Sequence, residues 1–254
     1  MITVNGVLIE PTVFPDGTSQ VWKLPDSFIK DIRTPIIEWT YSNDAEFFSI
    51  AQLKLLFDSV GRVPELFINY LPYGRQDKDV SNTSTFGLHA FAELLNTLRF
   101  RRVVILDPHS FKYQMIYNSE TYYPTDKVED LHRDLKIDMV VYGDTGAQHK
   151  YTNLYKFPSV SARKRRNESD GNIVSTVFDK VDAEKLKGKR VLIIDDICDG
   201  GATFTGIAKL LQEAGSSYIA LFVTYGLFTK GTQILHASGI DDIYFSHRIG
   251  KIIK

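Results

Sequence analysis

The chain has 254 residues and a formal net charge of −1, with 43% hydrophobic and 24% charged residues. This balance is ordinary for a globular protein in solution and favours neither nucleic acid nor a membrane surface as a partner. No apolar run approaches the roughly 20 residues that span a bilayer, and the first residues lack a signal-peptide pattern. The single cysteine, Cys198, excludes an internal disulfide and fits a reducing compartment, so we expect a cytoplasmic protein.

The pattern along the chain predicts a hairpin followed by alternating strands and helices. Ile2-Thr3-Val4 and Val7-Leu8-Ile9 flank Asn5-Gly6, a dipeptide that suits a type I′ turn. Strands that alternate with helices indicate an α/β fold with parallel sheets. The further strands that we expect are 20–22, 36–39, 66–69, 103–106, 139–142, 191–194, 219–223 and 243–245.

Apolar periodicity places helices between several of these strands. Asp44 can cap the first helix. The second covers residues 86–98, and the third ends at Gly215, a typical carboxyl cap. The residues that share one face of the first helix are Phe48, Ala51 and Leu55, and those that repeat along the third are Ile207, Leu210, Leu211 and Ala214.

Polar, ligand-type residues follow four of the predicted strands at the point where each strand ends. Open α/β sheets bind ligands outside the carboxyl ends of their strands. The repetition therefore predicts a ligand site rather than four unrelated turns. The four segments are Arg75-Gln76-Asp77-Lys78, Asp107 with His109, Asp144 with Gly146, and Asp195 with Asp196.

The residues after the last of these strands carry the sharpest prediction. Asp195 and Asp196 follow an apolar strand, where two unpaired charges are costly without a cation or a polar ligand. Their oxygens suit Mg²⁺ or sugar hydroxyls. The loop Asp199-Gly200-Gly201-Ala202-Thr203 leads into a helix, whose first N–H groups favour a phosphate. We therefore predict a phosphorylated sugar with a metal nearby.

For three other segments, the residues alone allow two interpretations of their role. Arg75-Gln76-Asp77-Lys78 is either a ligand-binding segment or a solvated helix start. His109 is a metal ligand or acid–base group, or else it is structural. The run Arg163-Lys164-Arg165-Arg166 is a solvated surface, or a mobile loop that neutralises charge in a transition state.

Taken in order along nearly the whole chain, these segments resemble the ribose-phosphate diphosphokinase family, which makes phosphoribosyl pyrophosphate (PRPP). The chain looks like a compact phage or bacterial member. The resemblance implies two similar phosphoribosyltransferase-like domains, each a mainly parallel sheet flanked by helices. We expect an ATP-side domain over 1–120, to which about 241–254 return, and a sugar-phosphate-binding domain over 121–240.

On the ATP side, Arg75-Gln76-Asp77-Lys78 is similar to the family's Arg-Gln-Asp-Arg/Lys segment, which implies that Arg75, Gln76, Asp77 and Lys78 contact ATP. Asp107-Pro108-His109 is similar to its Asp-Leu-His, which places His109 beside the ATP phosphates and the metal. Phe14-Pro15-Asp16-Gly17 is similar to its Phe-Ser-Asp-Gly-Glu, which reaches the adenine of a neighbouring subunit. Phe14 and Asp16 thus imply a homo-oligomer, a dimer or a hexamer, with a shared ATP site.

On the sugar side, Gly143-Asp144-Thr145-Gly146-Ala147 is similar to the family's Pro-Asp-x-Gly-Gly, which implies a metal or pyrophosphate-side role for Asp144. Lys164-Arg165-Arg166 resembles the Lys-Arg-Arg of the catalytic flexible loop. Lys164 and Arg166, together with His109, are therefore implied to be catalytic. The resemblance implies that Asp195 and Asp196 face the ribose hydroxyls. It also implies that five residues surround the 5-phosphate: Asp199, Gly200, Gly201, Ala202 and Thr203.

The implied reaction is Mg²⁺-dependent: the anomeric hydroxyl of ribose 5-phosphate attacks the β-phosphorus of ATP, and AMP leaves. The chain departs from the family at Asp-Gly-Gly-Ala-Thr, where Asp-Thr-Ala-Gly-Thr is usual, and at Thr18, where the family has Glu. The smaller Gly200-Gly201 loop leaves ADP-ribose open as a second acceptor, which would suit NAD salvage or rebuilding. A phosphoribosyltransferase that consumes PRPP is a further alternative, although it would need neither the Arg75 segment nor His109.

Overall fold

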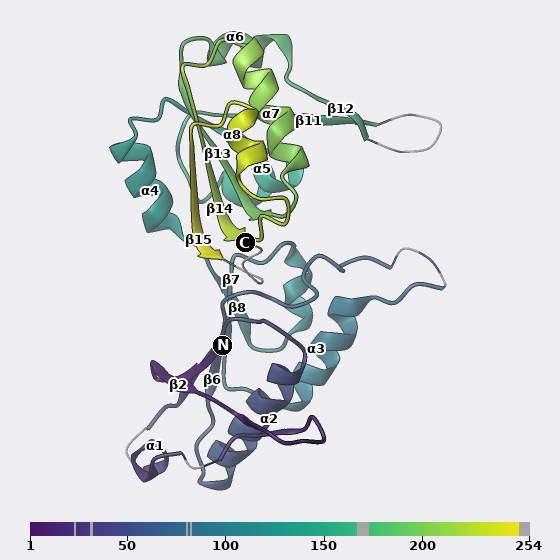
Figure 1. Ribbon diagram of the computed structural model, residues 1–254, viewed down its shortest axis with the longest axis vertical. Coiled ribbons are helices and arrows are strands. Elements are labelled where there is room, and N and C mark those ends of the chain that lie inside the picture. Colours follow the sequence, from purple (N-terminus) through teal and green to yellow (C-terminus); the bar gives the residue numbers. More distant parts are fainter. Residues whose placement is uncertain (23, 31–32, 80, 82, 167–172, 249–254) are drawn as a thin grey trace. The chain divides into compact units, whose positions relative to one another are not determined.

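The computed structural model describes residues 1–22, 24–30, 33–79, 81, 83–166 and 173–248 (Figure 1). The chain divides into two compact units, Met1–Tyr123 and Pro124–Lys254. Each unit contains one main sheet with helices packed on it, which confirms the predicted α/β class. Within the described residues, no helix combines the length and the hydropathy needed to cross a membrane.

The first unit is built on a six-stranded sheet in the order β2-β1-β5-β6-β7-β8. β1 runs antiparallel to β2 and β5, and the other neighbouring strands are parallel. The strands are β1 (Ile2–Val4), β2 (Val7–Ile9), β5 (Ile36–Trp39), β6 (Glu65–Ile68), β7 (Val103–Leu106) and β8 (Ser119–Tyr122). The helices are α1 (Asp26–Lys30), α2 (Ala45–Ser59), α3 (Gly87–Thr97) and the 3₁₀ helix η1 (Phe111–Met115). A separate hairpin joins β3 (Thr12–Val13) to β4 (Ser19–Gln20).

Local sequence signals explain the start of this unit and part of α2. Asn5 and Gly6 have φ angles of 48° and 81°, as a type I′ turn requires. Helix α2 forms where it was expected, but Phe48 and Leu55 share a face that is open to solvent, with 63% and 64% of each residue exposed. The face that packs into the core contains Ile50, Leu53 and Phe57.

The second unit is built on a five-stranded sheet in the order β10-β9-β13-β14-β15, in which every neighbouring pair is parallel. The strands are β9 (Met139–Tyr142), β10 (Ser159–Ser161), β13 (Arg190–Cys198), β14 (Tyr218–Gly226) and β15 (Asp242–Arg248). The helices are α4 (Thr125–Asp134), α5 (Thr145–Tyr151), α6 (Lys180–Leu186), α7 (Ala202–Glu213) and α8 (Gln233–Ala237). A second hairpin, β11 (Arg163–Arg166) with β12 (Ile173–Val177), extends away from this sheet (Figure 1).

The course of the chain differs from the expectation in one respect. Residues 242–248 do not return to the first sheet, because β15 pairs with β14 at the edge of the second sheet. The expected return of about 241–254 is therefore wrong for its described part, and residues 249–254 lie outside the description. The division between the units falls after Tyr123, a few residues beyond the expected position.

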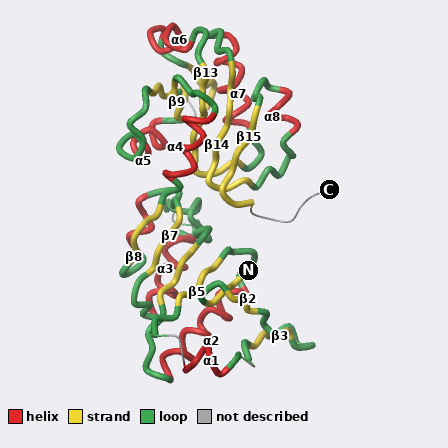
Figure 2. Tube along the Cα trace, turned by 90° about the vertical axis from the view of Figure 1, so that its left-hand side faces the viewer, coloured by secondary structure: helices red, strands yellow, loops and turns green. Residues whose placement is uncertain are grey.

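Helices cover both faces of the second sheet. On one face, Ile207 and Leu211 of α7 pack with Val191 and Ile193 of β13. On the other face, Tyr151 of α5 stacks on Tyr142 of β9, with ring centroids 6.3 Å apart. In Figure 2, α5 lies on the β9 side of this unit and α7 on the side of β13 and β14. The connections β9–α5–β10 and β13–α7–β14 therefore leave β9 and β13 in opposite directions.

Candidate functional site

The carboxyl edge between β9 and β13 is a topological switch point. Neighbouring strands whose connections leave in opposite directions open a crevice at their carboxyl ends, and α/β proteins bind ligands there. Asp144 follows β9, while Asp195 and Asp196 belong to β13. Three of the predicted ligand residues therefore come together at the edge that the topology singles out.

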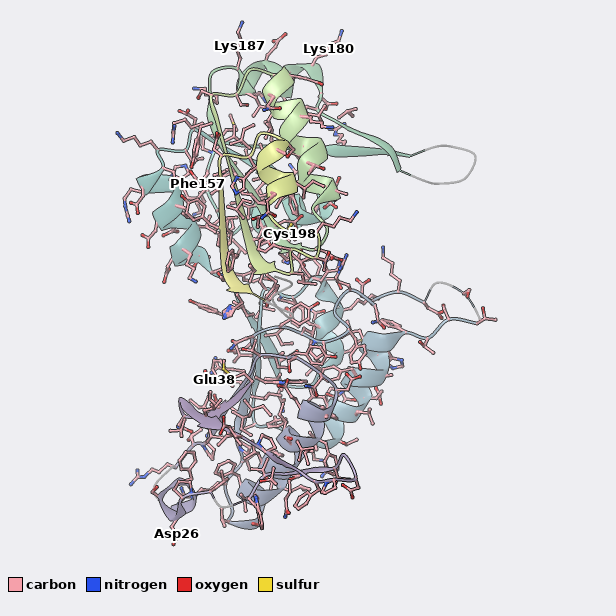
Figure 3. All side chains as sticks on the ribbon, in the orientation of Figure 1. Asp26, Glu38, Phe157, Lys180, Lys187 and Cys198 are labelled. Atoms are coloured by element: carbon pink, nitrogen blue, oxygen red, sulfur yellow. The ribbon has the colours of Figure 1, made fainter. Side chains whose placement is uncertain are left out.

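Strand β13 is longer than expected. It was predicted to end at Ile194, but it continues to Cys198, and Asp195 and Ile197 keep their register with Val223 and Tyr225 of β14. Asp195 and Asp196 are thus residues of a strand, not of a flexible loop. Cys198 is fully buried at the end of β13 (Figure 3), and burial raises the pKa of its thiol to about 12.

The surroundings of Asp195 oppose its negative charge. Burial is the largest cause that raises the pKa of Asp195 well above its usual value, and the neighbouring Asp196 and Asp144 raise it further. Its carboxylate accepts the backbone N–H of Asp196 at 2.9 Å. Gly143 lies against it, because a Cβ at Gly143 would meet Asp195 Oδ2 at 3.1 Å and Thr203 Cγ2 at 3.7 Å. A cation or hydroxyl donors supplied by a ligand would relieve this crowding of negative charge.

Asp144 also has a structural role. It is the N-cap of α5, where its side chain accepts the backbone N–H of Ala147 at 3.0 Å. Within the described residues, no group of three His, Cys, Asp or Glu side chains is arranged to hold a metal ion without help. His109 belongs to the first unit and Asp144 to the second, so neither unit by itself joins these two predicted metal ligands.

The loop after β13 turns sharply into α7. Gly201 has a φ of 79° and stands at the N-cap of this 12-residue helix, where it has no side chain of its own to cap the first N–H groups. Thr229 fixes the side chain of Asp199, because the Asp199 carboxylate accepts the Thr229 hydroxyl at 2.7 Å. The stem of Lys230 lies close to Gly200, where an added Cβ would meet its Cδ and Cε at 3.5 Å. Sequence reasoning missed Thr229 and Lys230, since they lie far from this loop along the chain.

We expect Gly201→Ala to weaken both the fold and the proposed phosphate loop. The left-handed backbone costs a residue with a Cβ about 1–2 kcal/mol, and that Cβ would lie 2.9 Å from Leu235 Cδ2. Gly206→Ala is the matched control within α7, because nothing lies within 4 Å of its added Cβ, and alanine there gains about 0.5–1 kcal/mol. The midpoint of thermal unfolding should fall for Gly201→Ala and rise for Gly206→Ala. An unchanged midpoint for Gly201→Ala would contradict the requirement for glycine at this turn.

In the first unit, the predicted ATP segment follows β6 after a tight turn. Tyr73 adopts a φ of 60°, and Gln76 donates its backbone N–H to the Tyr73 carbonyl at 2.8 Å. The Gln76 carbonyl then accepts the backbone N–H of Leu88 at 3.2 Å, which fixes the segment to the start of α3. Arg75 and Lys78 are exposed, and Asp77 is half-buried.

The segment after β7 presents one predicted residue to solvent. Asp107 is buried and has a φ of 37°, and its backbone N–H donates to the Tyr122 carbonyl at 2.8 Å. His109, two residues later, is exposed. The carboxyl edge of the first sheet therefore carries both predicted ATP-side segments.

An aromatic pocket of about 360 Å³ lies at the same edge, and sequence reasoning missed it. Asp44 lies on its wall and accepts the hydroxyls of Tyr41 at 2.9 Å and Tyr73 at 2.5 Å instead of capping α2. Burial, followed by this bond, raises the pKa of Tyr41 to about 12, so its hydroxyl stays a donor at neutral pH. Gln76 lines the pocket as well, and the rings around it are Trp39, Tyr41, Phe47, Tyr73 and Phe91.

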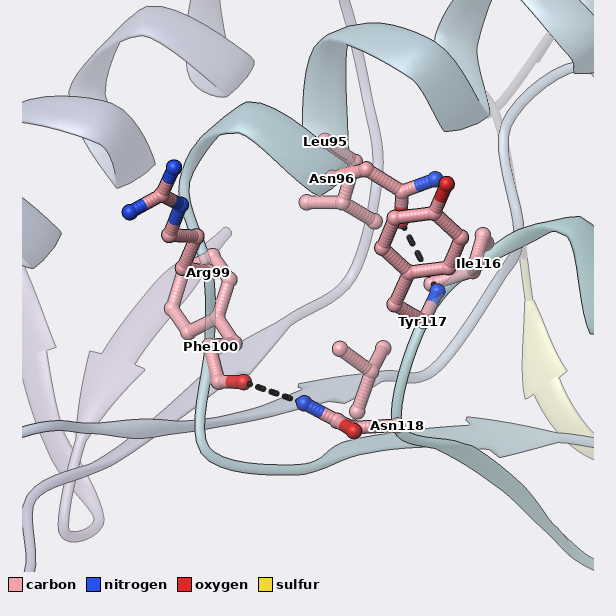
Figure 4. A pocket seen from close by; sticks show the side chains of 8 residues that line it. Leu95, Asn96, Arg99, Phe100, Ile116, Tyr117 and Asn118 are labelled. Carbon is pink, nitrogen blue, oxygen red and sulfur yellow. Dashed lines mark hydrogen bonds between the residues drawn. The ribbon is translucent and has the colours of Figure 1, made fainter.

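A smaller cavity of about 80 Å³ lies near the amino ends of β7 and β8 (Figure 4). Its amide side chains support the backbone: Asn96 accepts the N–H of Tyr117 at 2.8 Å, and Asn118 donates to the Phe100 carbonyl at 3.2 Å. Both amides hold connecting segments in place. We therefore assign this cavity a role in structure.

The remaining predicted residues lie on the two hairpins. Phe14 is partly exposed beside Trp22, with ring centroids 6.4 Å apart. Asp16 accepts the hydroxyl and the backbone N–H of Thr18 at 2.7 and 3.0 Å, and these bonds lower its pKa. Lys164 and Arg166 lie on β11, but their side chains fall outside the part of the chain that the structure describes.

Comparisons with known proteins identify similar sequences and a similar fold. Residues 152–253 match the model of the phosphoribosyl transferase domain. Ribose-phosphate pyrophosphokinases from Pyrococcus furiosus and Mycoplasmopsis pulmonis are 23% and 25% identical, each over 95% of this chain and over 86% and 76% of their own lengths. The phosphoribosylpyrophosphate synthetase of Mycobacterium smegmatis shares the fold, with a TM-score of 0.71 at 22% identity over 94% of this chain and 79% of its own.

Proposed function

The chain belongs, as a distant member, to the ribose-phosphate pyrophosphokinase family of enzymes, and we propose that it transfers the β,γ-diphosphoryl group of ATP to a ribose 5-phosphate-type acceptor. The observation that carries this proposal is the switch point between β9 and β13. It joins three carboxylates to the start of α7, whose N-cap is a glycine. Such an edge offers acceptors for sugar hydroxyls and N–H donors for a phosphate.

The ATP side is proposed to lie on the first unit. Arg75 and Lys78 supply exposed cations for the phosphates, with His109 at the neighbouring strand end. The adjacent aromatic pocket, which shares Gln76 with this segment, supports a role for this edge in binding a planar ligand. Asp77 completes the proposed contacts of this chain, whereas Phe14 and Asp16 would reach the adenine of a neighbouring copy in a homo-oligomer, a dimer or a hexamer.

In the proposed reaction, the anomeric oxygen of the acceptor forms a bond to the β-phosphorus of ATP. The bond between that phosphorus and the oxygen bridging to the α-phosphorus breaks, AMP leaves, and the hydroxyl proton passes to solvent. Asp195 and Asp196 orient the ribose hydroxyls, while residues 199–203 hold the 5-phosphate. Lys164 and Arg166 neutralise charge on the phosphoryl oxygens as it develops, which is the main requirement of phosphoryl transfer.

The carboxylates of the second unit also suit a magnesium ion. Mg²⁺ is usually held by one or two carboxylates together with substrate phosphates and water, and Asp144 lies close enough to Asp195 to affect its charge. Asp144 is the proposed metal ligand of this unit, and His109 is the proposed metal ligand of the first unit. When bound, Mg²⁺ supplies positive charge to the diphosphoryl group. We place the activity in the cytoplasm.

ADP-ribose is the second candidate acceptor. Its 5-phosphate continues into a second phosphate, which needs space and positive charge beside the loop. Gly200 has no side chain to block such an extension, and the Lys230 stem beside it carries an ammonium group one bond beyond Cε. This acceptor would link the chain to NAD salvage or rebuilding.

An assay of AMP release with each acceptor decides between these candidates. We expect turnover with ribose 5-phosphate in the presence of Mg²⁺ and ATP. Turnover with ADP-ribose but not with ribose 5-phosphate would show that ADP-ribose is the acceptor. If PRPP were consumed with a free base and no AMP were released from ATP, the chain would be a phosphoribosyltransferase instead.

A further inference from the structure

Lys150, in the last turn of α5, is buried beside the carboxylates of β13. Its side chain is 8% exposed, and its Nζ lies 4.0 Å from Asp196 Oδ2, whose side chain is also 8% exposed. The ammonium group lies 4.9 Å from the centroid of the Tyr151 ring. Lysine is seldom buried to this degree unless a negative charge compensates it. The pair with Asp196 provides that compensation.

Asp195 and Asp196 have different neighbours. Consecutive side chains of a strand leave from opposite faces, and here α7 and α5 cover those faces. Asp195 lies beside Gly143, which also faces Thr203 of the proposed sugar-phosphate loop. Asp196 lies beside Lys150, on the side of α5. Only one carboxylate of the pair therefore has this lysine as a neighbour.

We propose that Lys150 is a positioning residue for the carboxylate pair: it holds and neutralises Asp196, so that the pair meets the acceptor with one negative charge less. The reason is electrostatic. The acceptor carries an anionic phosphate into an edge that already holds Asp144, Asp195 and Asp196, and each uncompensated carboxylate there repels it. Without Lys150, the Asp196 carboxylate would also lose a cationic neighbour. The identity of the acceptor rests on the proposed function.

The direct test is the affinity for ribose 5-phosphate, measured by titration calorimetry and separately for ATP. Lys150→Met keeps the length of the side chain and removes its charge, so we expect affinity for the sugar phosphate to fall roughly tenfold or more. Affinity for ATP should stay nearly unchanged, and Lys150→Arg should restore most of the loss. Lys156→Met is the matched control, because Lys156 is an exposed lysine of the same unit.

A second readout does not depend on activity or ligand. Lys150→Met should lower the midpoint of thermal unfolding, because it leaves Asp196 buried without its cation. Adding Asp196→Asn should recover most of that shift, since the double variant removes both charges. Additive shifts in this cycle would show that the two groups do not interact.

The outcomes separate this inference from the proposed reaction. Equal losses of affinity for ATP and for the sugar phosphate, or no recovery with arginine, would reduce Lys150 to a structural residue and overturn the inference. Failure of the unsubstituted chain to bind ribose 5-phosphate would overturn it too. Sugar-phosphate binding that depends on Lys150 without any release of AMP would instead refute the proposed reaction and leave the positioning role intact.

Discussion

Replacing Lys164 with alanine is expected to lower turnover by roughly 10³-fold while leaving the affinity for ATP nearly unchanged. The proposed transition state spreads negative charge over the transferred diphosphoryl group, and a cation that approaches it there lowers the barrier. The ground state gains little from the same cation, because the Arg75 segment is proposed to hold ATP. The measurement is the rate of AMP release at saturating substrates, together with a separate titration of ATP.

The control for this experiment is Lys180→Ala, which removes an exposed lysine from the start of α6 in the same unit. It should leave both quantities unchanged. Unaltered turnover in Lys164→Ala would remove this residue from the mechanism. A parallel loss of ATP affinity and turnover would instead assign Lys164 to ground-state binding, and Arg166→Ala would then become the decisive variant.

Asp195→Asn is expected to change activity and stability in opposite directions. Loss of the carboxylate removes an acceptor for the ribose hydroxyls, so kcat/KM for the acceptor should fall roughly 100-fold. The same substitution removes a half-buried charge next to two others. The variant without ligand should therefore be more stable at pH 7, by on the order of 1 kcal/mol, or ~2–4 °C in the unfolding midpoint.

The sign of the pH dependence follows from the raised pKa of Asp195. In the folded chain this carboxyl keeps its proton to a higher pH than in the unfolded chain, where its pKa is near 3.8. Between the two pKa values the folded state binds more protons, so stability increases as the pH falls through this window. The advantage of Asp195→Asn should accordingly be largest near neutral pH and shrink on acidification.

A surface carboxylate provides the comparison. Asp134 is exposed beside Arg133, so Asp134→Asn should reproduce neither the gain in stability nor its dependence on pH. Thermal unfolding of both variants and the parent chain between about pH 4 and 8 makes the measurement. A loss of stability in Asp195→Asn at pH 7 would show that its bond to the Asp196 N–H outweighs the charge crowding.

The elements that the sequence predicts correctly are those with a local cause. The Asn5-Gly6 turn depends on two backbone conformations, and the end of α7 depends on Gly215, whose φ is 79°. Helix α4 escaped detection because few of its residues are apolar and only Val128 is buried. The placement of β15 was also not predicted, because its pairing with β14 depends on contacts between distant parts of the chain that no local pattern indicates.

The candidate site divides in the same manner. The residues at strand ends could be predicted, because a change from apolar to charged residues is visible along the chain. Lys150 and Thr229 could not, since each acts on a carboxylate that lies far away in the sequence. The aromatic pocket is contributed by β5, α2 and α3 together with the turn before the ATP segment. No single segment of the sequence therefore predicts this pocket.

The length of β13 has a consequence for how acceptor preference can change. Its pairing with β14 continues through Cys198, beyond both carboxylates, so their backbone is ordered before any ligand arrives. The phosphate loop begins only where this pairing ends. Substitutions or insertions at 199–201 can therefore reshape the grip on the phosphate while the carboxylates stay in register. Different parts of the chain therefore recognise the sugar and any group attached to its phosphate. The loop can change in sequence without disturbing the carboxylates that bind the sugar.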